Sequence, residues 1–332
     1  MREVLVAAME TISPLGASLQ DHMEGIGAGT SGSAPLCRFD ARSFPTTFGC
    51  EVKQPLTSLY GKIHPDVVAT FPFNRTMELF CCCLHLLEEK IRALADIVAS
   101  HRIGIFVGAD TETLSPERIS GLFTVSQQEC LELFATRNRA IASINPLVNP
   151  SHVATLYAAS LAGSTGIRHT NLSACASSAH ALGLAYRAIR SDACDCAVVG
   201  GVDSTINPFV YAAFSSLAMI STRNESPATA SRPFDLTRDG FVPGEGAGVV
   251  LLVSESVASQ FPKLLARLAG YGSSLDAYKV TAPHEEGLGA RLCMERCLAC
   301  ASWDASTVDY INAHGTSTPL NDLVETRALH QV

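Results

Sequence analysis

The chain has 332 residues, of which 47% are hydrophobic and 17% charged, so it can bury a large core. Its formal net charge of −8 and the lack of a lysine- and arginine-rich run exclude nucleic acid as the main partner. No apolar run approaches the length of a membrane span, and the acidic N-terminal segment does not have the pattern of a signal peptide. We therefore expect a globular, cytoplasmic protein with no membrane span.

Short apolar segments alternate with helical segments along the chain, and this alternation predicts a layered α/β fold. The expected strands cover residues 4–8, 103–107, 197–199, 249–253, 264–269 and 308–312. The expected helices cover residues 75–100, 116–144, 180–189 and 287–301. A loop rich in glycine, serine and proline, residues 25–35, follows the first strand.

From residue 264 the order of strand, helix and strand resembles a repeat of the first part of the chain. We accordingly divide the chain into an N-terminal half, residues 1–255, and the start of a C-terminal half, residues 256–332. The second cycle is much shorter than the first, so we expect on the order of a hundred residues to be absent from its C-terminus. The last residues carry no helix-ending signal, and the chain is expected to stop within a helix.

The strongest candidate for a catalytic group is Cys175, in the run NLSACASS at residues 171–178. An apolar strand is expected to end before it and an alanine-rich helix to begin after it. The unpaired N–H groups and dipole of a helix start lower the pKa of a thiol, and small neighbours leave the sulfur accessible. His314 lies in the run NAHGTSTPLND at residues 312–322. A cysteine and a histidine so placed are the parts that thioester acyl transfer needs.

Several long motifs in chain order resemble those of the β-ketoacyl-[acyl-carrier-protein] synthases of the type I/II kind, members of the thiolase-like superfamily. They are SPLG at 13–16, the run around Cys175, GGVD at 200–203, STRN at 221–224, RPFDLTRDGFVPGEGAG at 232–248, and residues 312–322. The resemblance covers nearly the whole chain. It implies a five-layered α/β/α/β/α fold built from two repeated halves, of which the second is truncated here.

The resemblance also implies an acyltransferase reaction. Cys175 would be acylated by the growing chain, and malonyl-carrier protein would then decarboxylate to a carbanion that attacks the acyl-enzyme, as in fatty acid or polyketide elongation. The backbone N–H of Cys175 would form half of an oxyanion hole. His314 fits the donor that stabilises the enolate formed on decarboxylation.

Four further residues receive roles from the same resemblance. Thr316 and Thr318 are implied to bind the phosphopantetheine arm, although their hydroxyls could equally cap a turn. Phe214 matches an aromatic residue that gates the acyl pocket. Glu325 matches a carboxylate held in an active-site ion-pair network.

Partners and cofactors follow from the same reaction. No metal or redox cofactor is expected, because the phosphopantetheine arm arrives on the acyl carrier protein. The chain is expected to form a homodimer, or a heterodimer with a ketosynthase-like subunit. The candidates for docking an acidic carrier protein are Arg75, Arg137, Arg139 and Arg223.

The chain also departs from the family pattern. A second catalytic histidine with its nearby lysine should follow Glu325, and a late glycine-rich loop should supply another oxyanion N–H; neither is present. We therefore expect these 332 residues to be insufficient for normal condensation. The alternative function is that of a non-catalytic or chain-length-setting subunit of a heterodimeric ketosynthase, and the presence of Cys175 favours the enzyme.

Three cysteine and glycine patterns suggest other sites, and each is better explained by structure. Cys293, Cys297 and Cys300 have the spacing of an iron–sulfur motif, but that spacing also places them on one face of a helix. The three consecutive cysteines at 81–83 cannot point at one metal from a helix and are expected in the core. The glycines at 27–32 follow no strand, and those at 244–248 enter a strand, so neither run is expected to bind a nucleotide.

Overall fold

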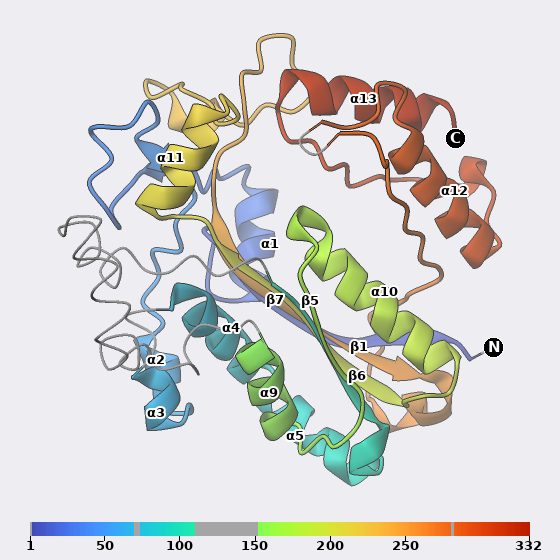
Figure 1. The fold of residues 1–332 in the computed structure, drawn as a ribbon. Helices are drawn as coiled ribbons and strands as arrows, with labels where there is room; N and C mark the ends of the chain where they lie inside the picture. The colour runs from blue at the N-terminus through green and yellow to red at the C-terminus, as the bar shows by residue number, and fades with distance from the viewer. Residues whose placement is uncertain (1, 70–73, 110–151, 280–281) are drawn as a thin grey trace, which may run out of the picture.

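A computed structural model describes residues 2–69, 74–109, 152–279 and 282–332. The expected helix at 116–144 lies outside the described residues, as do Arg137 and Arg139. The centre of the described fold is a six-stranded sheet in the order β5-β4-β6-β7-β1-β8 (Figure 1). In that order the strands are Arg168–Asn171, Ile103–Ala109, Cys196–Ser204, Glu245–Ser254, Val4–Ile12 and Ala266–Arg267.

The sheet is mixed. Strand β4 pairs in parallel with β5 and β6, whereas β7 runs antiparallel to β6 and β1, and β8 runs antiparallel to β1. Every residue of β4 is buried, as expected for a parallel strand covered on both faces. The four strands predicted at 4–8, 103–107, 197–199 and 249–253 are confirmed, with longer bounds than their apolar runs suggested.

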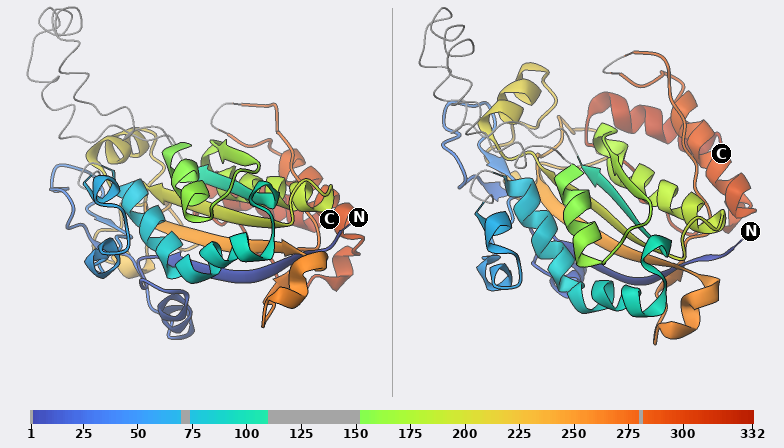
Figure 2. Two further views of the ribbon diagram at one scale, coloured as in Figure 1. Left: turned by 90° about the horizontal axis from the view of Figure 1, so that it is seen from below. Right: turned by 60° about the horizontal axis from the view of Figure 1, so that its bottom comes forward.

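Helices cover both faces of the sheet. One face carries α4 (Arg75–Leu86), α5 (Glu88–Ile97) and α9 (His152–Leu161), and the other carries α10 (Ser177–Arg190) (Figures 1 and 2). Successive residues of a strand point to opposite faces, so Val198 joins the core under α4 and Val199 the core under α10. The helix predicted at 75–100 is divided at Leu87, whose backbone leaves the helical conformation.

The remaining elements lie around this layered centre. The longer helices are α1 (Leu19–Gly27), α11 (Pro208–Ser216), α12 (Leu288–Ala301) and α13 (Pro319–His330). Two single-turn helices, α2 (Thr57–Tyr60) and α3 (Pro65–Val68), and a two-stranded ribbon of β2 (Ala34–Pro35) and β3 (Phe48–Gly49) complete the N-terminal part. Short 3₁₀ turns cover Ser100–Arg102, Ala174–Ala176, Pro227–Thr229, Glu255–Gln260 and Ala305–Thr307. None of the helices described is both long and apolar enough to cross a membrane.

The C-terminal part differs most from the sequence prediction. The helix expected at 287–301 is confirmed, but the strand expected at 308–312 is wrong, and Tyr310 there is 78% exposed. The strand expected at 264–269 shortens to two residues, and α13 ends at His330 rather than running through the last residue. An apolar segment becomes a strand only beside another strand, and no described strand lies next to residues 308–312. Of the two central sheets expected from the sequence, the described residues therefore form one.

The cysteine and glycine patterns have the structural explanations predicted for them. Cys81, Cys82 and Cys83 lie in α4 and are fully buried. The glycine run at 27–32 follows the end of α1, and the run at 244–248 leads into β7. In the described part of the chain, no three histidine, cysteine or acidic side chains are grouped as metal ligands.

Candidate active site

Cys175 lies on the turn that joins β5 to α10. The turn is a single 3₁₀ turn, and Ala174 before the cysteine has a φ of 48°, a left-handed conformation that costs about 1 kcal/mol or more for a residue with a side chain. The cysteine therefore stands on a sharply bent connection and is exposed. The strand predicted before it is confirmed as β5, but its predicted apolar character is wrong: β5 is polar and no residue of it is fully buried, because it is an edge strand paired only with β4 among the strands described.

A network of small polar side chains fixes this turn. The buried Ser177 hydroxyl donates to the Ala174 carbonyl and accepts from the Ser173 N–H, both at 2.7 Å. The Asn171 amide donates to the Ser177 carbonyl at 3.1 Å, and Ser173 Oγ donates to Asn171 Oδ1 at 2.9 Å. His180 Nδ1 lies 3.1 Å from Ser173 Oγ, so this histidine supports the turn. Sequence analysis did not find these roles, since serine and asparagine are common in any loop.

Two glycines allow the turn to lie directly against the sheet. A Cβ on Gly108, in β4, would lie 2.3 Å from the backbone carbon of Ser177. A Cβ on Gly201, in β6, would lie 2.4 Å from Ser178 Oγ. Any other residue at either position would push the first turn of α10 away from the strand ends. The two glycines thus determine how closely the turn that carries Cys175 packs on the sheet.

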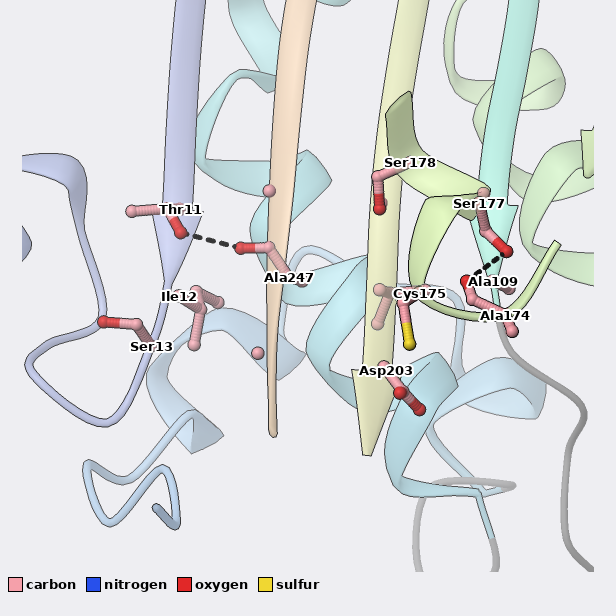
Figure 3. Close-up of a pocket in the computed structure, with 15 residues that line it drawn as sticks. Thr11, Ile12, Ser13, Ala109, Ala174, Cys175, Ser177, Ser178, Asp203 and Ala247 are labelled. Atoms are coloured by element: carbon pink, nitrogen blue, oxygen red, sulfur yellow. Dashed lines mark hydrogen bonds between the residues drawn. The ribbon is translucent and has the colours of Figure 1, made fainter. Parts of the chain in front are cut away.

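Cys175 lines a cavity of about 330 Å³ at one end of the sheet. In Figure 3 its sulfur points toward Asp203, at the end of β6. The lining comes from the carboxyl ends of β1, β4 and β6, the beginning of β7 and the cysteine turn. The carboxyl ends of parallel strands are the usual position of ligand sites in open α/β sheets. The lining residues are Thr11, Ile12, Ser13, Gly108, Ala109, Ala174, Cys175, Ser177, Ser178, Gly201, Val202, Asp203, Gly246, Ala247 and Gly248.

The environment of Cys175 differs from that of the core cysteines. All the cysteines in the described ranges are free thiols, and of these only Cys37 and Cys175 are exposed. Burial raises the pKa of Cys82 and of Cys196 to about 12, which keeps both thiols protonated and unreactive at neutral pH. Cys175 thus combines exposure with a place in a cavity at the strand ends.

His314 lies on an exposed loop that Glu325 holds through the backbone. The Glu325 carboxylate accepts the N–H of His314 at 2.6 Å and the N–H of Gly315 at 2.9 Å. Glu325 comes from the middle of α13, so the helix fixes the loop that precedes it. The sequence prediction placed this carboxylate in an ion-pair network; within the described residues it has no ion-pair partner and binds the loop instead.

A second carboxylate, Asp322, anchors the next part of the loop. It is only 1% exposed and accepts the N–H of Ser317 at 3.1 Å and of Phe234 at 2.7 Å. Arg238 Nε lies 3.4 Å from the same carboxylate and donates to the Thr318 carbonyl at 3.0 Å. We call residues 232–240 the clamp segment, because they hold the histidine loop against the start of α13. Sequence analysis recognised this motif but not its contacts with the loop.

Thr316 and Thr318 lie together on the histidine loop. Their hydroxyl oxygens are 2.8 Å apart. Thr318 is also the N-cap of α13 and accepts the N–H of Asn321 at 3.3 Å. The capping role that the sequence left open for Thr318 is therefore confirmed. Its role toward a phosphopantetheine arm stays a prediction.

The predicted site residues do not all meet at one described cavity. None of His314, Thr316, Thr318 and Phe214 lines the Cys175 cavity among the described residues. Phe214, in α11, packs edge-on against Phe241 with ring centroids 5.1 Å apart.

The candidate docking arginines that the structure describes are engaged within the chain. Arg75 pairs with Glu245 at 2.8 Å and with Glu78 at 2.7 Å, and its side chain is only 13% exposed. Arg223 pairs with Asp239 at 3.2 Å. Arg75 is therefore a structural residue rather than a docking residue.

Two protein-family models together match nearly the whole chain. Residues 1–258 match the model described as the N-terminal domain of beta-ketoacyl synthase, and residues 265–332 match the model of its C-terminal domain. The chain is 33% identical over 339 residues to a 3-oxoacyl-[acyl-carrier-protein] synthase 2 of Synechocystis, covering 99% of this chain and 76% of that protein. It is 45% identical over 172 residues, 51% of this chain and 37% of that protein, to the mitochondrial synthase of Arabidopsis thaliana.

Solved structures share the fold. The ishigamide ketosynthase/chain length factor superposes with a TM-score of 0.82 at 26% identity, covering 100% of this chain and 77% of that one. A beta-ketoacyl synthase from Burkholderia phymatum gives a TM-score of 0.80 at 24% identity, covering 100% of this chain and 78% of that one. These values confirm the thiolase-like α/β class predicted from the sequence.

Proposed function

The chain belongs to the beta-ketoacyl synthase family, and from this premise we propose that Cys175 is the nucleophile of an acyl-chain-elongating condensation. The observation that carries the proposal is the exposed thiol on the left-handed turn between β5 and α10, where it lines a cavity at the strand ends. Members with the name 3-oxoacyl-[acyl-carrier-protein] synthase match 99% of the chain. The enzyme class is therefore that of the β-ketoacyl-carrier-protein synthases, which are acyltransferases.

The reaction divides into two steps. In the first, the Cys175 thiolate attacks the carbonyl of an acyl thioester, and the carrier's pantetheine thiolate leaves. In the second, a malonyl thioester loses CO₂, the resulting carbanion attacks the acyl-cysteine carbonyl, and the Cys175 thiolate is released. We assign His314 as the donor to the enolate oxygen, with Glu325 and the clamp segment as the groups that position its loop.

We assign the substrate-binding roles to the residues that the motifs indicate. Thr316 and Thr318 present neighbouring hydroxyls beside His314, which suits hydrogen bonds to the amides of a phosphopantetheine arm. Phe214 is proposed to border the acyl chain, and its half-buried position on α11, against Phe241, supports a wall of a binding site. The chemistry requires no metal or redox cofactor, because CO₂ departs with its bond electrons left on a thioester enolate.

Partners and compartment are proposed on the same basis. A solved relative is a ketosynthase in complex with a type II PKS acyl-carrier protein, and another is a ketosynthase in complex with its chain length factor. For this chain we propose an acyl carrier protein as substrate carrier and a ketosynthase-like second subunit, identical or not. The edge strand β5 supports a dimer, since it precedes the nucleophile and pairs with one strand only among those described. The free thiols support a reducing compartment, and we propose the cytoplasm.

The central test is acyl transfer to Cys175. The protein is incubated with an acyl-carrier-protein thioester at saturating concentration, and the acyl adduct is located by peptide mass mapping. We expect an adduct on Cys175, and little or no β-ketoacyl product from these 332 residues alone once malonyl-carrier protein is added, because the second catalytic histidine of the family pattern is not among them. Failure to form the adduct at saturation would overturn the proposal. Light scattering at micromolar protein tests the assembly, where a monomer alone would contradict the proposed dimer.

A second candidate function is that of a non-catalytic or chain-length-setting subunit of a heterodimeric ketosynthase. It is favoured by one observation: no histidine is among the described residues that line the Cys175 cavity. Under this function the chain would form no acyl adduct, but its addition to a ketosynthase subunit would change the length of the product chain. The same acylation assay therefore separates the two functions.

A further inference from the structure

Among the described residues that line the Cys175 cavity, Asp203 is the one carboxylate, and the condensation gives it no role. Gly201, two residues earlier in β6, faces Ser178 at the start of α10, and alternation along a strand places Asp203 on the same face of the sheet. The residue that pairs with Asp203 in β7 is Gly246, which has no side chain to cover the carboxylate. In Figure 3 the Cys175 sulfur points toward Asp203. The carboxylate therefore lies in the direction in which an acyl group on this thiol would extend.

A short hydrogen bond orients the Asp203 side chain. The backbone N–H of Ser204 donates to Asp203 Oδ1 at 2.7 Å. The residue is half-buried, so its charge is screened less by water than that of a fully exposed carboxylate. Asp203 thus brings a negative charge to a defined position in the cavity wall.

The described lining offers an anionic ligand little compensation for this charge. It contains no lysine, arginine or histidine. The Thr11 hydroxyl already donates to the Ala247 carbonyl at 2.9 Å, and the Ser177 hydroxyl donates within the cysteine turn at 2.7 Å. The start of α10 attracts negative charge, but it does so at the sulfur of Cys175 itself. An anionic group beyond the sulfur, toward Asp203, would therefore meet a like charge.

The proposed reaction uses two thioesters that differ in charge. A growing acyl chain is neutral, whereas the malonyl group carries a carboxylate. A malonyl group attached to Cys175 would block the thiol, so the first step requires a choice between the two groups. A fixed like charge rejects one of two ligands of similar size without new contacts to the other.

We propose that Asp203 is a specificity-determining residue that keeps anionic acyl groups, malonyl in particular, off Cys175. This rests on the proposed function and adds a charge selectivity to its first step. In that step a bond forms between Sγ and the acyl carbon, the carrier's C–S bond breaks, and the carrier thiolate leaves with the bonding electrons. The Asp203 charge raises the barrier to this step for an acyl group that carries a carboxylate, relative to a neutral group of the same size.

The first test measures charge selectivity at the thiol without acyl transfer. Alkylation of Cys175 by anionic iodoacetate and by neutral iodoacetamide is followed by peptide mass mapping, and the ratio of the two rates is compared between variants. Both reagents react with the same thiol, so the ratio does not depend on its thiolate fraction. We expect Asp203→Asn to raise the ratio of iodoacetate to iodoacetamide about fivefold at low salt, and the increase to shrink at high ionic strength. An unchanged ratio would overturn the proposal.

Two variants separate the charge of Asp203 from other effects of substitution. Asp203→Glu retains the charge and should keep the ratio within about twofold of wild type. A fivefold rise in this variant as well would show that a change in local structure, and not the charge, sets the ratio, and would overturn the proposal. Asp96→Asn removes an exposed carboxylate of α5, outside the cavity lining, and should leave the ratio unchanged.

The second test uses malonyl and acetoacetyl pantetheine thioesters, which are similar in size and differ in charge. Acyl adducts on Cys175 are measured by peptide mass mapping, and malonyl and acetyl adducts are counted together so that loss of CO₂ from the adduct is not missed. We expect Asp203→Asn to raise the ratio of malonyl to acetoacetyl transfer about fivefold, and Asp96→Asn to leave it unchanged.

The two tests distinguish failure of this proposal from failure of the proposed function. Acylation of Cys175 with the same malonyl-to-acetoacetyl ratio in wild type and Asp203→Asn would overturn the role of Asp203 and leave the condensation in place. No acylation by either thioester, together with an alkylation ratio that depends on Asp203, would overturn the proposed function and support the charge selectivity at Cys175.

Discussion

The cysteine turn and the histidine loop are held in different ways. The turn before α10 lies directly on the sheet, and glycines in β4 and β6 leave no space between the helix start and the strands. The loop at 314–318 lies on none of the strands that the structure describes and is held by two carboxylates of α13 and by the clamp segment. The turn therefore depends on close packing and on hydrogen bonds between neutral groups, whereas the loop depends on charged hydrogen bonds. A closely packed turn is disrupted when a substitution adds atoms that overlap its neighbours. A loop held by charged hydrogen bonds is disrupted when a substitution removes the charge.

The largest expected effect comes from Cys175→Ala, which should abolish the acyl adduct. The free energy of unfolding should change by less than about 0.5 kcal/mol, because the side chain is exposed. Intact mass after incubation with an acyl-carrier thioester, together with urea unfolding, measures both quantities. Cys37→Ala removes the other exposed thiol and serves as the control that should keep the adduct. An adduct that persists in Cys175→Ala would place the nucleophile elsewhere.

Asp322→Asn tests the charged anchor of the loop. This buried carboxylate accepts two backbone N–H groups and pairs with Arg238, so its neutralisation should destabilise the protein by about 3 kcal/mol. Hydrogen exchange should accelerate in residues 312–330 and stay unchanged in α10. Asp235→Asn, an exposed carboxylate in the clamp segment that binds only Thr237 among the described residues, should have a much smaller effect on the unfolding free energy. An equal loss of unfolding free energy in the two variants would show that the burial of Asp322 does not increase its contribution to stability.

Gly108→Ala tests the packed anchor of the turn. The added Cβ would lie 2.3 Å from the Ser177 backbone, so the variant should lose about 2 kcal/mol of stability. The rate of Cys175 alkylation by iodoacetamide should also change, because the turn must move. Gly61→Ala is the matched control: apart from its chain neighbours, no described residue has an atom within 4 Å of the added Cβ, and the variant should be neutral or slightly more stable. A wild-type alkylation rate in Gly108→Ala would contradict the packing argument.

Glu325→Gln should have the smallest effect and should be confined to the loop. The neutral glutamine side chain cannot offer two charged oxygen acceptors to the backbone N–H groups of His314 and Gly315. Hydrogen exchange at these two backbone N–H groups should therefore be about tenfold faster, equivalent to roughly 1.4 kcal/mol of lost protection. Acylation of Cys175 should be unaffected. Glu295→Gln breaks an ion pair on the surface of α12 and should not alter exchange at 314 and 315. A loss of Cys175 acylation in Glu325→Gln would show that the two regions are coupled.

The sequence determined the elements whose signals are local. The apolar runs predicted β1, β4, β6 and β7, and the alanine-rich run predicted α10. The motifs identified the family and the two loops that carry Cys175 and His314. Hydrophobic periodicity is strong in buried strands and helices, which explains why these predictions were confirmed.

Only the tertiary structure decided which segments pair and what holds each loop. Residues 308–312 include apolar side chains suited to a strand, but no described strand lies beside them, and Tyr310 and Ile311 stay exposed. The strand expected before Cys175 is present as β5, but it is polar rather than apolar, since an edge strand needs no apolar run. The contacts of Ser177, Asp322 and Glu325 join residues through the folded chain. Such contacts arise from geometry that a pattern of residue types does not contain: the sequence specifies the groups, and packing specifies which groups meet.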